Sequence, residues 1–220
     1  MADQFPVTEK TKITRLPKRG SYDKATVYAI LDEALYCNLA FALDQQPFQI
    51  PTGFVRINDR LYVHGSVGSG YLRDLVAKKM PVCIGVTFMD GLVLARSAMH
   101  HSVNYRSVII FSTPRLVEDK DEQYLALEAF TNKVCPGRWD DIRKPTANEW
   151  KETLVISFDI HEASAKIRTG APKDDAEDYD LDVWAGVVPM EITYGVPQAD
   201  PALKAGVVLP GYLSAGRAKG

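Results

Sequence analysis

The sequence lacks a strong charge of either sign, a long hydrophobic run and an apolar segment near its start. Its 26 basic and 28 acidic side chains leave a formal net charge of −2 over 220 residues. A balance this even gives no global attraction to nucleic acid or to an anionic membrane. No stretch reaches the roughly 18 apolar residues of a membrane span. We therefore expect a soluble, cytoplasmic protein with no nucleic-acid or membrane partner.

Cysteine is scarce, and the usual signatures of hydrolases and metalloenzymes are missing. Cys37, Cys83 and Cys135 are far apart and form no CxxC pair, which is typical of reduced thiols in a reducing compartment. No GxSxG, HxxxH or HExxH motif occurs. We expect no metal site. Because no residue stands out as a nucleophile or general acid, a bound cofactor would have to carry any enzymatic chemistry.

The length and a hydrophobic share of 46% fit one globular domain with extensions. We predict an N-terminal arm over residues 1–22, a domain over residues 23–193 and a C-terminal extension over residues 194–220. Helices are expected at residues 24–35, 71–79 and 119–134. Strands are expected at residues 36–43, 48–57, 60–64, 82–88, 92–97, 105–111, 154–160, 163–167 and 184–193. Tight turns join most of these strands, so the fold class is mainly β within α+β, a closed or nearly closed antiparallel barrel with peripheral helices.

Several local features of these elements can be compared with a structure. Asp23 is expected to cap the first helix, which has a buried face of Val27, Ile30, Leu31 and Ala34. Pro51 puts its strand at an edge or a bulge. Asp90-Gly91 is expected to turn the chain between two strands. In the third helix, the residues expected to lie inside are Leu125, Ala129 and Phe130, and the six carboxylates of residues 174–182 suggest a solvated loop.

The stretch from Leu92 to Ser112 has two apolar runs that flank an unusually polar segment. Hydrogen-bonding side chains crowd this segment, namely Arg96, Ser97, His100, His101, Ser102, Asn104, Tyr105, Arg106 and Ser107. A simple turn between strands does not need such a density of donors and acceptors. We therefore predict a binding site at the end of the sheet.

Three further features have a binding and a structural interpretation. The loop Gly65–Gly70 opens onto a helix and could bind phosphate through backbone N–H groups with Ser66 and Ser69, or simply join strand to helix with Ser69 as the N-cap. Arg106 could clamp a phosphate, or pair with an acidic helix or a second subunit. Trp184 could stack on a planar cofactor, although burial in the core is the commoner role.

The segments LYVHGSVGSGYLRDL, DGLVLARSAMHHSVNYRSVIIFS, EASAKIRTGAP and VWAGVVP resemble the flavin-binding split-barrel proteins related to pyridoxamine 5′-phosphate oxidase. The similarity covers roughly residues 20–193 and is greatest to the branch of Nim-type nitroimidazole reductases. It implies an antiparallel split β-barrel that forms a homodimer, with FMN in clefts between the subunits. The family's basic phosphate strand, an RxVxLK pattern, has only Arg56 as a counterpart here, and its C-terminal substrate-binding Arg motif is missing. These departures argue against vitamin B6 oxidation.

The resemblance also implies roles for individual residues. The cofactor-binding set is His64, Gly65, Ser66, Ser69, Ser97, His100, His101, Ser102, Tyr105, Arg106, Ser107 and Trp184. The function that it implies is an FMN-dependent oxidoreductase, passing electrons from a reduced nicotinamide to a small acceptor such as a nitroaromatic or a quinone. Two alternatives stay open: a flavin-binding or storage protein without turnover, and a haem-binding protein with His100 or His101 as the axial ligand.

Overall fold

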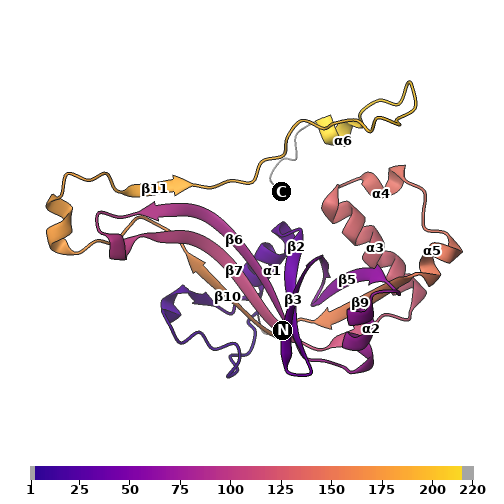
Figure 1. Ribbon diagram of the computed structural model, residues 1–220, viewed down its shortest axis with the longest axis horizontal. Coiled ribbons are helices and arrows are strands. Elements are labelled where there is room, and N and C mark those ends of the chain that lie inside the picture. Colours follow the sequence, from indigo (N-terminus) through magenta and orange to yellow (C-terminus); the bar gives the residue numbers. More distant parts are fainter. Residues whose placement is uncertain (1–2, 215–220) are drawn as a thin grey trace.

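The computed structural model describes residues 3–214 as two antiparallel sheets with helices around them and one long projecting arm (Figure 1). Residues 1–2 of the predicted N-terminal segment (residues 1–22) and residues 215–220 of the predicted C-terminal extension lie outside the described residues. The α-helices are α1 (Lys24–Glu33), α2 (Gly70–Ala77), α3 (Lys120–Val134), α4 (Arg138–Asp141), α5 (Ala147–Lys151) and α6 (Gly211–Ser214). Short 3-10 helices are η1 (Pro17–Arg19), η2 (Ala98–His100) and η3 (Ala176–Asp180). No helix in this range is long and apolar enough to cross a membrane.

The larger sheet has seven strands and the smaller sheet four. In the larger sheet the order is β1 (Gly20–Ser21), β10 (Glu162–Arg168), β7 (Ser102–Ser112), β6 (Val82–Leu94), β2 (Tyr36–Leu43) and β3 (Gln46–Gly53), and β11 (Gly186–Pro189) pairs with β6. In the smaller sheet the order is β4 (Val55–Ile57), β5 (Arg60–Ser66), β9 (Thr153–Asp159) and β8 (Pro114–Leu116). All pairings are antiparallel, as predicted from the succession of strands.

The main core lies between the two sheets and is closed by α1 and α2. The predicted face of α1 is confirmed, since Val27, Ile30, Leu31 and Ala34 are at most 4% exposed. The predicted cap is confirmed as well, because the Asp23 carboxylate accepts the Thr26 N–H at 2.7 Å. A second, smaller apolar cluster packs the outer face of the smaller sheet against α3.

The strand predicted over residues 48–57 is wrong as one element. Phe54 interrupts it, so that β3 ends the larger sheet and β4 belongs to the smaller one. The Phe54 side chain has no exposed surface and fills the core where the chain changes sheets. Pro51 does lie on β3, an edge strand, where its missing N–H leaves no unpaired partner inside the sheet.

The turn predicted at Asp90-Gly91 is also wrong. β6 runs without interruption from Val82 to Leu94, and its pairing with β7 shifts between Met89 and Gly91. Such a shift is a β-bulge, which takes up one extra residue and bends the strand. A Cβ on Gly91 would lie 3.0 Å from the Val188 carbonyl oxygen, so the glycine lets β11 approach closely.

The inward face of α3 and the extent of the last strand were also predicted wrongly. Leu125 of α3 is 49% exposed, while Gln123 is buried because its side chain donates to the Val117 carbonyl at 2.7 Å. The last strand covers only Gly186–Pro189 of the expected residues 184–193. Trp184 precedes this strand and is 67% exposed, so the core alternative that was weighed for it does not form in this chain. From residue 190 to 210 the chain forms neither helix nor strand.

Candidate functional site

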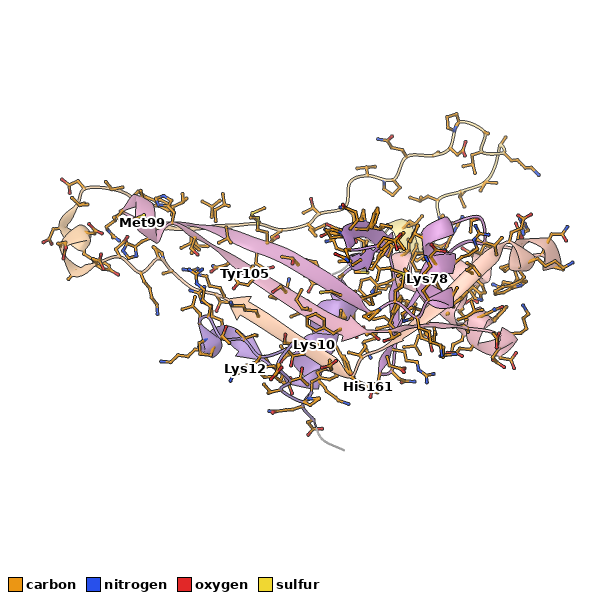
Figure 2. The ribbon with its side chains drawn as sticks, turned by 60° about the horizontal axis from the view of Figure 1, so that its bottom comes forward. Lys10, Lys12, Lys78, Met99, Tyr105 and His161 are labelled. Atoms are coloured by element: carbon orange, nitrogen blue, oxygen red, sulfur yellow. The ribbon has the colours of Figure 1, made fainter. Side chains whose placement is uncertain are left out.

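The arm formed by β6, β7 and β11 carries one group of the predicted site residues at its tip. Figure 2 shows Met99 of η2 at this far end. The side chain of His101 hydrogen-bonds through Nδ1 to the Ser97 carbonyl at 2.9 Å, and Nε2 of His100 lies 3.2 Å from Asp175. The Ser97 hydroxyl is buried and has no hydrogen-bond partner among the described residues. The tip therefore holds an unused polar group within a structured loop.

The acidic segment that was expected to be a solvated loop is tied to this tip. Asp174 accepts the Arg96 backbone N–H and one guanidinium N–H, each at 3.0 Å. Burial alone would raise the pKa of the Asp174 carboxyl, but these bonds from Arg96 hold it below the ordinary value. Metal-ligating atoms of His100, Asp175 and Asp178 lie within 4.8 Å of one another on the exposed side of the loop.

The middle of β7 carries Tyr105, Arg106 and Ser107. Arg106 is engaged in ion pairs: its guanidinium donates to both carboxylate oxygens of Asp90, at 3.0 and 2.9 Å, and to Glu33 of α1. These partners raise the pKa of Arg106 above its ordinary value. The Ser107 hydroxyl donates to the Lys166 carbonyl at 3.2 Å. Of the alternatives for Arg106, pairing with acidic side chains is the arrangement that this chain forms.

The end of β5 and its connection to α2 carry the other group, His64, Gly65, Ser66 and Ser69. A Cβ on Gly65 would lie 2.5 Å from Leu72 Cδ1, so a side chain here would force the buried Leu72 of α2 to shift. Ser66 Oγ accepts the Gly68 N–H at 3.1 Å. Ser69 occupies the N-cap position of α2, but its hydroxyl does not cap the helix and is buried without a partner in the described part of the chain.

The two groups lie toward opposite ends of the folded molecule. In Figure 2 Met99 marks the arm tip at one end, and Lys78, which ends α2, lies toward the other. Trp184 belongs with the tip, because β11 begins two residues later and pairs Gly186 with Leu94 of β6. One chain thus brings Ser97, His100, His101, Ser102 and Trp184 to one end and leaves His64, Gly65, Ser66 and Ser69 at the other.

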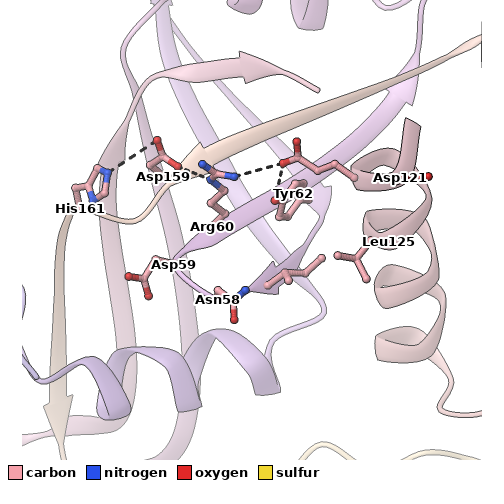
Figure 3. A pocket seen from close by; sticks show the side chains of 10 residues that line it. Asn58, Asp59, Arg60, Tyr62, Asp121, Leu125, Asp159 and His161 are labelled. Carbon is pink, nitrogen blue, oxygen red and sulfur yellow. Dashed lines mark hydrogen bonds and ion pairs between the residues drawn. The ribbon is translucent and has the colours of Figure 1, made fainter. Parts of the chain in front are cut away.

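Two surface cavities border the smaller sheet. The larger, about 620 Å³, lies between β5, β9 and the start of α3 (Figure 3). Arg60 pairs there with Asp159 at 2.8 Å and with Glu122 at 3.6 Å, and Asp59 and Asp121 add two more carboxylates. The cavity is lined by residues from 57–62, 121–125 and 159–161, so no local sequence motif indicates it.

The smaller cavity, about 440 Å³, is bordered by His64 of β5. Its other walls come from α3, the α4–α5 connection and the start of β9, with side chains of Leu127, Arg143, Pro145, Glu149 and Thr153. The His64 ring packs edge-on against Phe130 at a centroid distance of 4.6 Å. His64 was predicted as a binding residue but its surroundings were not, because the other lining residues are 63 to 89 positions further along the chain.

Comparison with known proteins shows the family. A model of the pyridoxamine 5′-phosphate oxidase family matches residues 23–167. The structure of the flavocytochrome Anf3 from Azotobacter vinelandii aligns with a TM-score of 0.89 and 36% sequence identity, covering 96% of this chain and 97% of that one. The FAD and heme binding protein from Mycobacterium smegmatis aligns with a TM-score of 0.85 and 34% identity, covering 90% of this chain and 97% of that one. No curated protein sequence matches.

The expected branch within the family needs correction. A candidate 5-nitroimidazole antibiotic resistance protein from Bacteroides thetaiotaomicron aligns with a TM-score of 0.57 and only 21% identity, covering 67% of this chain and 86% of that one. The similarity to this protein extends to the fold alone, whereas the Azotobacter and Mycobacterium proteins match nearly the whole chain. The predicted split-barrel fold is confirmed, and the chain is a member of the pyridoxamine 5′-phosphate oxidase family.

Proposed function

We propose that this protein is a flavin-binding redox protein that also holds haem, with FAD in place of the FMN first expected. The observation that carries the proposal is the match over 96% and 90% of the chain to a flavocytochrome and to an FAD and heme binding protein. Such cofactors would supply the electron transfer, the flavin in steps of one or two electrons and the haem in single steps. The residues of the chain bind and orient them.

The chemistry of the two residue groups fits a flavin. Buried polar side-chain atoms without partners are uncommon, and the described residues have four: the hydroxyls of Ser69, Ser97 and Ser157, and Nε of Arg96. Apart from the Ser157 hydroxyl on β9, these atoms lie in the segments predicted to bind the cofactor. Backbone N–H groups at the start of α2 add the donors that a phosphate group prefers. A bound flavin would satisfy groups that the described chain leaves unpaired.

We propose further that the protein is a homodimer in which the arm tip of one subunit lies over the β5–α2 connection of its partner. The separation of the two residue groups supports this arrangement, because neither group alone surrounds a ligand. Apolar side chains also remain exposed along the arm and the following segment, among them Trp184, Val188, Met190 and Ile192. Monomeric proteins rarely expose large apolar patches, so these side chains support an interface.

The first experiment is an absorbance spectrum of the purified protein, with the cofactors extracted and identified by mass spectrometry. We expect flavin bands and a Soret band, and FAD in the extract. FMN as the sole flavin would overturn the FAD proposal. Addition of NADH or NADPH without air then tests turnover: bleaching of the flavin supports an oxidoreductase that uses a reduced nicotinamide, and an unchanged spectrum contradicts that electron donor. Absence of any flavin after reconstitution with FAD would contradict the proposed function.

Sedimentation tests the dimer. The wild-type protein is expected at twice the mass of the chain, whereas Val188→Glu/Met190→Glu should shift it toward the monomer, because burying two carboxylates in an apolar interface is unfavourable. Val7→Glu, at another exposed apolar position, serves as the control. Loss of flavin along with the dimer would agree with a site shared between subunits. A monomeric wild-type protein that retains flavin would contradict the arrangement.

A further inference from the structure

We propose that His64 is the axial ligand of the haem iron, and that the cavity between β5, α3 and α5 receives the haem. This inference rests on the haem component of the proposed function and assigns it to a place in the chain. It departs from the sequence-based alternative, in which His100 or His101 is the ligand. It also assigns His64 to the haem and not to the flavin.

The cavity has the size and walls of a cofactor site. Its volume of about 440 Å³ lies within the roughly 300–1,000 Å³ range of pockets for small molecules and cofactors. Leu127 and Pro145 provide apolar surface, and Phe130 lies next to it against the His64 ring. A porphyrin presents two flat apolar faces and needs such surfaces on either side. The edge-on contact with Phe130 fixes the orientation of the imidazole.

His64 has the properties of an available ligand. Its ring is half-buried at the cavity wall, and a neutral imidazole has a nitrogen lone pair that can bind a metal. Among residues 3–214, neither ring nitrogen of His64 makes a hydrogen bond. Haem iron in proteins is commonly held by a proximal histidine of this kind.

The other three histidines are less suitable. The imidazoles of His100 and His101 are each engaged in a hydrogen bond, to Asp175 and to the Ser97 carbonyl. His161 lines the larger cavity of Figure 3, where its neighbours include Asp59, Asp121, Glu122 and Asp159. Haem carries two propionates, and four carboxylates would repel them. Of the two cavities that border the smaller sheet, the one beside His64 combines an imidazole without a hydrogen bond in the described chain, the apolar side chains of Leu127 and Pro145, and a cation.

Arg143 is the cation at the rim of this cavity. Its guanidinium binds both carboxylate oxygens of Glu149, at 2.7 and 2.6 Å, and its side chain remains 69% exposed. Arginine has five N–H donors, so Arg143 retains donors for a haem propionate while Glu149 orients it. Glu149 is itself held in place by the capping box with Thr146.

The location also brings the haem close to the proposed flavin segment. His64 and Ser66 lie two residues apart on β5, which is roughly 7 Å along a strand. Side chains two apart on a strand point to the same face. Haem bound to His64 would therefore lie beside the connection that leads to Ser69 and α2, where electrons can pass over a short distance.

The test uses spectroscopy of the full-length chain and is independent of turnover. Protein expressed with added haem precursor is compared as wild type, His64→Ala, His100→Ala, His101→Ala and His161→Ala. For each we record the Soret band, the electron paramagnetic resonance spectrum of the ferric form, the flavin content and the circular dichroism. We expect His64→Ala alone to lose the haem or the spectrum of nitrogen-ligated iron while it retains flavin. Added imidazole should restore that spectrum in His64→Ala by occupying the vacated position.

The outcomes separate the inference from the proposed function. An unchanged Soret band and resonance spectrum in His64→Ala would overturn the assignment of the ligand, and loss of the band in His100→Ala or His101→Ala would move the site to the arm tip. A wild-type protein that holds flavin but no haem, even after titration with hemin, would remove the haem component and this inference with it. A folded His64→Ala protein that loses flavin and keeps haem would return His64 to the flavin site. Arg143→Gln provides a second variant, expected to weaken hemin binding without changing the ligand spectrum.

Discussion

The carboxylate of Asp174 is completely buried against Arg96, although the two residues are 78 positions apart in the sequence. This contact fixes the segment before η3 to the arm tip, beside Ser97 and His101. Arg96 is held further by the ring of Tyr179, which lies 4.8 Å from its guanidinium carbon. The tip is thus an ordered structure even though many of its side chains are exposed.

We expect Asp174→Asn to loosen residues 170–183. Asparagine removes the charge that Arg96 pairs with, so trypsin should cleave after the exposed Lys173 about ten times faster than in the wild type. Asp182→Asn, at an exposed position in the same segment, is the matched control. The pKa of Asp174 is lowered below 3.8, so its contribution is present above that pH and is lost as the pH falls through the lower folded value. Equal cleavage of both variants would contradict this role.

Arg106 should act through its ion pairs rather than through a cofactor. In Arg106→Ala, Asp90 and Glu33 would face each other without a cation between them. Because these groups are partly exposed, we expect the free energy of unfolding to fall by only about 1–2 kcal/mol. Denaturant unfolding measures this change, and the flavin content should stay that of the wild type. Loss of flavin with unchanged stability would identify Arg106 as a phosphate ligand instead.

Removing the unpaired hydroxyl of Ser69 or Ser97 is expected to affect the stability of the apoprotein and the binding of FAD differently. Since neither hydroxyl has a partner in the described chain, Ser69→Ala and Ser97→Ala should leave the stability of the apoprotein unchanged or slightly higher. Each should weaken FAD binding about tenfold, as expected for one lost hydrogen bond. Ser107→Ala is the control, because its hydroxyl already donates to the Lys166 carbonyl. Fluorescence titration of the apoprotein with FAD measures the affinities.

We expect Lys133 to make the free energy of unfolding depend on pH in the alkaline range. Burial lowers the pKa of its amine from 10.5 to about 8, in part offset by Asp32. Between these two values the unfolded chain binds a proton that the folded chain does not, so stability should rise with pH from about 8 to 10.5. Compared with Lys133→Met, the wild type should gain about 2–3 kcal/mol over this range. Denaturant unfolding at several pH values tests the difference, and parallel curves for the two proteins would contradict it.

Local sequence was sufficient to predict the helix starts and most strands. The Asp119 carboxylate accepts the Glu122 N–H at 2.8 Å, which begins α3 at the predicted place. Caps are local contacts, since a carboxylate needs only an N–H three residues away. Polar density alone also located the arm tip, because four of the predicted residues, Ser97, His100, His101 and Ser102, lie together there.

Contacts between distant segments decided what local patterns could not. Asp90 looked like a turn residue, but pairing with β7 and β11 keeps its strand extended through a bulge. Leu125 was expected in the core, yet the packing of α3 on β4 and β5 buries Gln123 and Ala126 instead. A hydrogen bond to the Val117 carbonyl offsets the cost of burying the polar amide.

The sequence by itself determined which residues are candidates for binding a cofactor, because dense polar side chains and glycine-rich connections are local features. Only the tertiary structure decided how they are grouped. It put Ser97 and Ser69 at opposite ends of the chain, gave Arg106 two carboxylate partners, and turned His64 toward a cavity lined by residues 127–153. The physical reason is that the direction of a side chain and the identity of its partners depend on strand pairing and helix packing across the whole chain, which no local pattern records.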